Sequence, residues 1–195
     1  MELLAQAEPP VGLYVGLGIA FVLLLWVAGT FNGLVRLRQH VRESWHGIDV
    51  QLKRRYDLIP NLVAAVKGYA AHERDLLEGL AAARTRAQAN RGPVASQVED
   101  ERPLIAGLRQ LLALAERYPE LKADRNFLAL QEELADTEDR IAAARRFYNG
   151  NVRDYNTRRE SFPSSLLARL FSFKGESYWE IEEASQRARP EVGLS

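Results

Sequence analysis

The stretch VGLYVGLGIAFVLLLWVAGTF, residues 11–31, contains no charged side chain. A helix rises about 1.5 Å per residue, so this stretch reaches about 31 Å and matches the roughly 30 Å hydrocarbon core of a bilayer. The rest of the chain is rich in Ala, Leu, Glu and Arg, which favour helix over strand. We therefore predict an all-α fold, in which an N-terminal single-pass transmembrane helix precedes an antiparallel bundle of long helices.

The first ten residues distinguish a retained anchor from a signal peptide. Signal peptides begin with a basic region and continue with a short apolar run. Residues 1–10 instead carry Glu2 and Glu8 and no Lys or Arg, and the apolar run after them is long. We predict a short N-terminal tail at 1–10 and an uncleaved transmembrane anchor at 11–31.

The charges that follow the anchor predict its orientation. Arg36, Arg38 and Arg42 come soon after the apolar run, whereas no basic residue precedes it. Cytoplasmic flanks of membrane helices carry an excess of Lys and Arg. The N-terminus is therefore expected outside the cell (inner) membrane and the helical domain in the cytoplasm. The alternative is that these membrane-proximal arginines only solvate the start of a helix.

Composition limits the functions that the remaining chain can have. Lys and Arg total 26 and so do Asp and Glu, so no global charge points to nucleic acid as a partner. The absence of cysteine excludes disulfides, zinc–thiolate sites and a thiol nucleophile. About 160 residues follow the anchor, which is enough for one domain with its own core.

Hydrophobic periodicity predicts long helices. Apolar residues alternate at spacings of three and four from residue 41 to 83, and this register holds across Pro60 and Gly68. We predict one helix from the membrane to about residue 90, kinked where the Pro60 ring meets the carbonyl of Tyr56. An amide or arginine from the third helix is expected to bond that carbonyl.

Two further helices are predicted, at about 96–118 and about 121–160. The stretch Asn90-Arg91-Gly92-Pro93 separates the first and second helices, and Tyr118-Pro119 ends the second. Pro163 stops the third helix, and a short amphipathic piece and an aromatic-rich segment follow it. Residues 186–195 are predicted to form a flexible C-terminal tail.

Four sequence motifs resemble those of one known family. The motifs are RRYDLIPNLVAAVKGYAAHE (54–73), YPELKADRNFLALQEEL (118–134), TEDRIAAARRFYNGNVRDYN (137–156) and SFPSSLLARLF (161–171). They resemble the LemA family and occur in its order. The resemblance implies a LemA-like helical-bundle domain over residues 32–185, behind a membrane anchor in a bacterial protein. Some relatives are associated with organising internal membranes, and others with membrane proteases, and no catalytic residue carries over.

No motif in the sequence predicts catalysis. Glu43 and His46 have the Glu-x-x-His spacing of di-iron bundles, but those proteins need a second copy and two further glutamates, and no second copy is present. A chance surface pair is the favoured interpretation. There is no phosphate-binding glycine loop and no nucleophile elbow. We predict no enzymatic activity, no cofactor and no metal.

Polar residues on the predicted helix seams form two groups, one near Pro60 and one that repeats a Tyr-Asn pair after seven residues. We predict a structural polar network that fixes the helix register, with Tyr148 and Asn149 bonded to another helix. The alternative is a surface for a partner or ligand. The network residues are Tyr56, Asp57, Pro60, Asn61, Tyr148, Asn149, Tyr155 and Asn156.

The predicted helix lengths leave an apolar stripe uncovered. In an up-down-up arrangement the third helix runs away from the membrane, so Trp45, Ile48 and Leu52 would be bare and would form a homo-oligomer interface. The alternative is that the first helix breaks at Pro60, or that the third helix descends and covers the stripe. A second contact is predicted along the small residues of the anchor, Gly12, Gly16 and Ala20.

Together these observations predict a membrane-anchored helical scaffold that self-assembles and organises membrane or membrane-protein partners. The expected partners are the lipid bilayer, further copies of the chain, and other membrane proteins such as a membrane protease. The alternatives are a membrane-shaping protein and an adaptor for a membrane protease.

Overall fold

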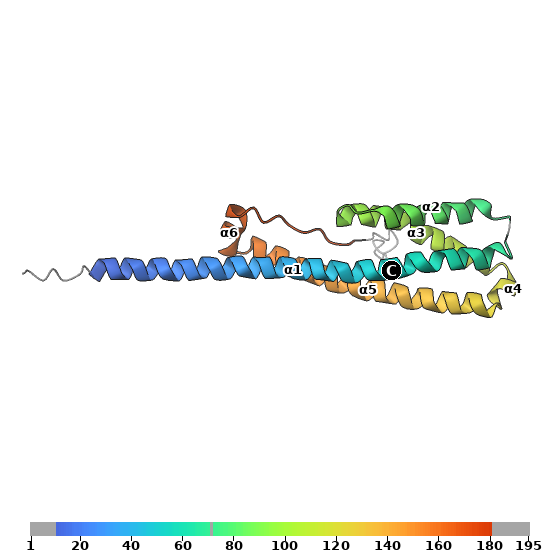
Figure 1. Ribbon diagram of the computed structural model, residues 1–195, viewed down its shortest axis with the longest axis horizontal. Helices are drawn as coiled ribbons and strands as arrows, with labels where there is room; N and C mark the ends of the chain where they lie inside the picture. Colours follow the sequence, from blue (N-terminus) through green and yellow to red (C-terminus); the bar gives the residue numbers. More distant parts are fainter. Residues whose placement is uncertain (1–10, 71, 181–195) are drawn as a thin grey trace, which may run out of the picture. The chain divides into compact units, whose positions relative to one another are not determined.

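A computed structural model describes residues 11–70 and 72–180 and confirms the all-α prediction. Within these residues the chain forms helices and no strand (Figure 1). The predicted tails at 1–10 and 186–195 lie outside the described residues. The helices are α1 (Val11–Lys67), α2 (Arg74–Ala89), α3 (Val94–Ala115), α4 (Pro119–Lys122), α5 (Arg125–Glu160) and α6 (Ser164–Leu170).

The described chain divides into two compact units, to which α1 and α5 both contribute. The first, called here the anchor unit, comprises residues 11–40 and Arg153–Glu176. The second, the bundle unit, comprises Val41–Val152 and residues 177–180.

Four of the helices, α1, α2, α3 and α5, pack side by side in the bundle unit, and the short α4 connects α3 to α5. α2 and α3 form a hairpin that lies along the C-terminal part of α1 (Figure 1). The α5 helix runs antiparallel to α1, because Arg55 contacts Glu138 and Tyr69 contacts Asp124. The core consists of apolar side chains from all four helices, including Leu52, Ile59, Leu62, Leu80, Leu104, Leu111, Phe127 and Leu134.

The prediction of one helix from the membrane to residue 90 is wrong, because the chain turns after Lys67. The N–H groups of Tyr69 and Ala70 both donate to the carbonyl of Val66, and the helical ladder ends there. Gly68 opens this turn, and glycine costs about 1 kcal/mol more than alanine inside a helix. The extra turn adds one helix to the bundle and so reverses the direction of α5 relative to α1.

Pro60 lies inside α1, and the helix continues through it. Proline has no N–H, so the carbonyl of Tyr56 lacks its usual helical donor. The Nε of Arg84 donates to this carbonyl at 2.6 Å. The donor is therefore an arginine of α2, and not a group from the third helix as predicted.

The predicted third helix divides into α4 and α5 at Asp124. The backbone N–H of Phe127 donates to Asp124 Oδ1 at 2.9 Å, which is the arrangement of a helix N-cap. The Tyr69 hydroxyl donates to Asp124 Oδ2 at 3.2 Å. The Phe127 N–H and the Tyr69 hydroxyl lower the pKa of the Asp124 carboxyl. This cap fixes where α5 begins and ties it to the end of α1.

Candidate functional site

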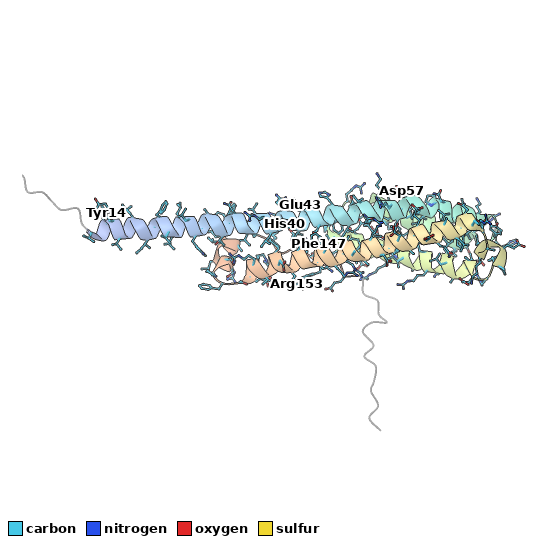
Figure 2. The ribbon with its side chains drawn as sticks, turned by 90° about the horizontal axis from the view of Figure 1, so that it is seen from below. Tyr14, His40, Glu43, Asp57, Phe147 and Arg153 are labelled. Carbon is cyan, nitrogen blue, oxygen red and sulfur yellow. The ribbon has the colours of Figure 1, made fainter. Side chains whose placement is uncertain are left out.

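The first sixteen residues of α1 have exposed side chains on every face of the helix. Tyr14 lies near the start of this stretch, where no other described element runs beside the helix (Figure 2). The stretch is long and apolar enough to cross a membrane, and none of it is buried inside the described structure. Such a surface is unfavourable in water and suits a hydrocarbon environment.

The predicted membrane-proximal arginines lie on α1 just beyond this stretch. Arg36 and Arg42 are exposed. Arg38 is half-exposed and its Nε lies 3.7 Å from a carboxylate oxygen of Glu176. One of the three is therefore partly neutralised within the anchor unit.

The small residues Gly12, Gly16 and Ala20 are exposed along the apolar stretch. A side chain added at either glycine would meet no atom of the described structure within 4 Å. This face is not covered by the described part of the chain, and the role of the three small residues in helix pairing stays a prediction.

The stripe of Trp45, Ile48 and Leu52 is covered by the chain itself, which corrects the predicted oligomer interface. Ile48 and Leu52 are buried. The Trp45 ring is 5.5 Å from the ring of Tyr148 and 5.2 Å from that of Trp179, measured between centroids. The physical reason is the extra turn after Lys67, because it makes α5 run antiparallel to α1.

Buried charges occupy the middle of the bundle unit. Arg55 is 1% exposed and Glu101 is fully buried, and their side chains form a salt bridge between α1 and α3. The second guanidinium nitrogen of Arg55 bonds Glu138 of α5 at 2.9 Å. The Tyr56 hydroxyl donates to Glu101, and Gln97 Nε2 donates to the Tyr56 oxygen at 3.0 Å. This Arg55–Glu101 network connects three helices.

The network shifts the ionisation of its members. Burial alone would lower the pKa of Arg55, but the carboxylates of Glu101 and Glu138 outweigh it and raise the pKa above its ordinary value. Burial, and then the negative charge of Glu101, raise the pKa of Tyr56 far above its ordinary value. The guanidinium therefore stays charged, and the phenol stays protonated.

The polar group predicted around Pro60 does not form one network. Tyr56 is buried, whereas Asp57, Pro60 and Asn61 are exposed. Figure 2 shows Asp57 on the outer side of α1. The correction follows from helix geometry, since neighbouring positions point about 100° apart and only Tyr56 faces the core.

In the bundle unit a tyrosine–asparagine pair holds an extended segment of backbone. The Tyr148 hydroxyl donates to the carbonyl of Ser177 at 2.8 Å. Asn149 bonds both backbone groups of Trp179, since its Nδ2 donates to the carbonyl at 3.0 Å and its Oδ1 accepts from the N–H at 2.9 Å. We call this arrangement a Tyr–Asn clamp.

The same clamp occurs in the anchor unit. The Tyr155 hydroxyl donates to the carbonyl of Lys174 at 2.7 Å. Asn156 donates to the carbonyl of Glu176 at 2.9 Å and accepts from its N–H at 3.0 Å. Burial is the main cause that raises the pKa of Tyr155 above its ordinary value.

Both clamps bond an extended segment of the chain, which corrects the expectation that Tyr148 and Asn149 bond another helix. Residues 173–180 have no regular secondary structure, so their backbone groups need partners outside a helix or a sheet. The clamps satisfy several of them. Trp179 is buried beside Trp45, which anchors the segment by its side chain as well.

The sequence analysis did not identify the partners of Arg55 and Trp45. Arg55 lies at a seam position of the predicted first helix, and a charge there needs an opposite charge. Gln97 and Glu101 are four residues apart and so share one face of α3, which was a usable signal. Nothing in the local pattern identified Trp179 as the residue that covers Trp45.

No group of three or more His, Cys, Asp or Glu side chains that could hold a metal occurs among residues 11–70 and 72–180. Glu43 and His46 are both exposed on α1. The di-iron interpretation of their spacing therefore has no further ligands in the described part of the chain.

Comparison with known proteins finds one matching family and several similar magnetosome proteins. The model of the LemA family matches residues 44–193. The magnetosome protein MamQ of Magnetospirillum gryphiswaldense is similar, with 24% identity over 191 residues that cover 85% of this chain and 70% of the relative. The magnetosome protein MamQ 2 of Paramagnetospirillum magneticum is 25% identical with the same coverage.

Proposed function

Because the chain belongs to the LemA family, we propose that it is a non-catalytic, membrane-anchored scaffold that organises membrane or membrane-protein partners. Family membership, the similar magnetosome proteins and the exposed apolar helix together support a membrane-associated role. The scaffold function is more specific than this membrane-associated role, and we assign it to the bundle unit.

The observation that carries the proposal is the surface of α1 between Val11 and Trp26, where no side chain is covered by the rest of the described chain. The same helix continues without a break into the bundle unit.

The anchor is tested by carbonate extraction of membranes from cells that express the full chain. Leu17→Arg combined with Val22→Arg should release the protein, because an arginine at the centre of a membrane helix costs about 2.5–3.5 kcal/mol on insertion scales. Val50→Arg is the matched control, because Val50 is exposed outside the apolar stretch. If both chains extract alike, the apolar stretch is not an anchor.

The scaffold function is tested by gentle detergent extraction, followed by mass measurement and identification of bound proteins. A complex that contains further copies or membrane proteins supports the proposal, and a membrane protease is among the partners to be sought. We place any self-association on the Gly12, Gly16 and Ala20 face, since the Trp45 stripe is covered. A single copy of the chain without bound proteins, extracted from cells at the native expression level, would contradict the proposed scaffold function.

We also propose an orientation in which the N-terminus lies outside and the bundle unit lies in the cytoplasm. The support is the asymmetry of charge around the apolar stretch, with Arg36, Arg38 and Arg42 on one side only.

A further inference from the structure

A second apolar surface lies in the anchor unit, on and beside the short helix α6. Phe162 is 82% exposed, Leu166 57% and Leu170 74%. Leu166 and Leu170 are spaced by four, so they follow one side of α6, and Phe162 lies in the turn just before the helix. The opposite side of α6 carries Ser164, Leu167 and Ala168, which are buried. The helix is therefore held by one face and presents large apolar side chains on the other.

The place where α6 packs is the end of the apolar stretch of α1. The ring of Phe31 is 5.0 Å from that of Phe171 and 5.5 Å from that of Phe173. Phe31 is the last residue of the uncharged run 11–31. Both views show α6 against this part of α1 (Figures 1 and 2). If α1 crosses a bilayer, α6 lies where the hydrocarbon meets the headgroups.

The charge of the anchor unit fits the same place. Residues 11–40 and 153–176 contain seven Lys or Arg and three Asp or Glu, a net charge of +4 in a chain whose overall formal charge is zero. Arg158 and Arg169 are exposed, and in sequence Arg158 precedes the apolar residues and Arg169 lies among them. Cationic residues next to an exposed apolar helix face are the combination that binds anionic lipid surfaces.

We infer that α6 is a second membrane contact, which inserts Phe162, Leu166 and Leu170 into the lipid interface beside the anchor. The partner is an anionic lipid surface, and not a second protein. A lipid partner follows from the continuity of this face with the anchor and from the local excess of positive charge. The inference rests on the proposed membrane anchor and adds that the chain also binds the bilayer surface by an amphipathic helix.

The inference predicts how deep individual side chains lie in a vesicle. The chain has no cysteine, so one introduced cysteine gives a single labelling site. The full chain is reconstituted into phosphatidylcholine–phosphatidylglycerol vesicles that carry nitroxide lipids with either a shallow or a deep quencher. A polarity-sensitive fluorophore is attached in Val22→Cys, Leu166→Cys or Asp136→Cys, the last being an exposed residue of the bundle unit.

At Leu166 we expect blue-shifted emission that the shallow quencher reduces more than the deep one, because interfacial helices lie about 5–10 Å below the surface. Val22 should show the reverse order, and Asp136 no quenching. Adding Leu170→Asp to the Leu166→Cys chain should abolish the quenching, whereas adding Leu128→Asp should not. Leu128 is the matched control, because it is an exposed leucine of the bundle unit.

The outcomes separate this inference from the proposed function. Quenching at Val22 without quenching at Leu166 would overturn the α6 contact and leave the anchor in place. A blue shift at Leu166 without lipid quenching would mean that protein covers the face, and would also overturn the inference. Absence of quenching at Val22 would refute the anchor and the α6 contact together.

Discussion

Arg55 lies at a position where the helical spacing favours an apolar side chain, and carboxylates from two other helices surround its charge. Glu101 is fully buried, and its positively charged partner is Arg55. A buried charge that loses its partner retains the cost of leaving water. At the scale of single residues, the stability of the bundle unit therefore depends on keeping this pair intact.

Glu101→Leu should destabilise the bundle unit by about 3–5 kcal/mol, because it leaves the Arg55 guanidinium buried with only the half-exposed Glu138. Urea unfolding of the detergent-solubilised chain measures this change. Combining it with Arg55→Met should recover most of the loss, since a matched apolar pair is tolerated. Glu99→Leu is the exposed control and should change stability by less than about 0.5 kcal/mol. An equal effect of Glu99→Leu and Glu101→Leu would contradict the network.

Tyr56 makes the chain sensitive to alkali. Its pKa is raised in the folded state, so the unfolded chain releases the phenolic proton near the ordinary value of 10.0 while the folded chain retains it. The contribution of Tyr56 to the free energy of unfolding is therefore fully present below about pH 10 and is lost as the pH rises above that value. Tyr56→Phe should flatten this alkaline decline in thermal unfolding scans. If both chains decline equally, burial and the Glu101 carboxylate do not raise the pKa of Tyr56.

At the scale of elements, the α1 helix was predicted correctly as a long apolar-to-amphipathic helix, but its end was not. The periodicity continues beyond Gly68, because α2 has its own apolar face in nearly the same register. Periodicity reports which residues face a core, and it does not report whether the chain reverses between them. Leu80 belongs to the predicted apolar register of residues 41–83 and is buried, although it lies on α2 and not on the first helix.

Arg84 and Pro60 should be energetically coupled. Arg84→Met leaves the Tyr56 carbonyl without a donor and should cost about 1–3 kcal/mol. In a Pro60→Ala chain the amide of residue 60 can donate to that carbonyl, so the same Arg84→Met change should cost less. Unfolding of the four chains of this double-mutant cycle gives the coupling energy. Additive effects would show that Arg84 does not replace the missing helical hydrogen bond.

The clamp on α5 gives a second prediction for an element. Asn149→Ala removes both bonds to Trp179 and should lower the melting temperature, with a loss of about 1–3 kcal/mol. Amide hydrogen exchange of residues 174–179 should rise in this variant. Asn126→Ala, at an exposed asparagine near the start of α5, is the control. Unchanged stability together with lost partner binding would favour the alternative that this pair serves a partner.

At the scale of the whole molecule, the all-α fold class and the exposed apolar stretch at the start of α1 could be predicted from the sequence, because both follow from composition and run length. The pairing of distant segments was not accessible in the same way. The C-terminal segment reaches Trp45 through Trp179, and these residues are separated by most of the chain. The prediction that Ile48 lies on an uncovered stripe assumed three helices. Because the turn after Lys67 was not predicted, the homo-oligomer interface was placed on a surface that the chain itself covers.

The orientation of the whole chain is open to a direct test. A reporter that is active only in the cytoplasm, fused after Ser195, should be active if the arginines beyond the anchor stay inside. The matched chain with Arg36→Glu, Arg38→Glu and Arg42→Glu should show reduced activity. Activity of a periplasmic reporter in the natural chain would reverse the proposed topology.

The Tyr–Asn clamps determine which amino-acid substitutions are tolerated in the segment that they hold. The side chains of Asn149 and Asn156 bond only backbone N–H and C=O groups of this segment. They therefore satisfy its main chain as a neighbouring β-strand would. The identities of Ser177 and Tyr178 are then nearly free to vary, as no clamp bond uses their side chains. Gly175 is not, because a side chain there would lie 3.2 Å from the Arg159 guanidinium and 3.4 Å from Asn156 Oδ1. Proline is the exception at positions 176 and 179, where the clamps require an N–H. The segment must therefore preserve a pattern of backbone donors and acceptors, together with the buried Trp179 side chain.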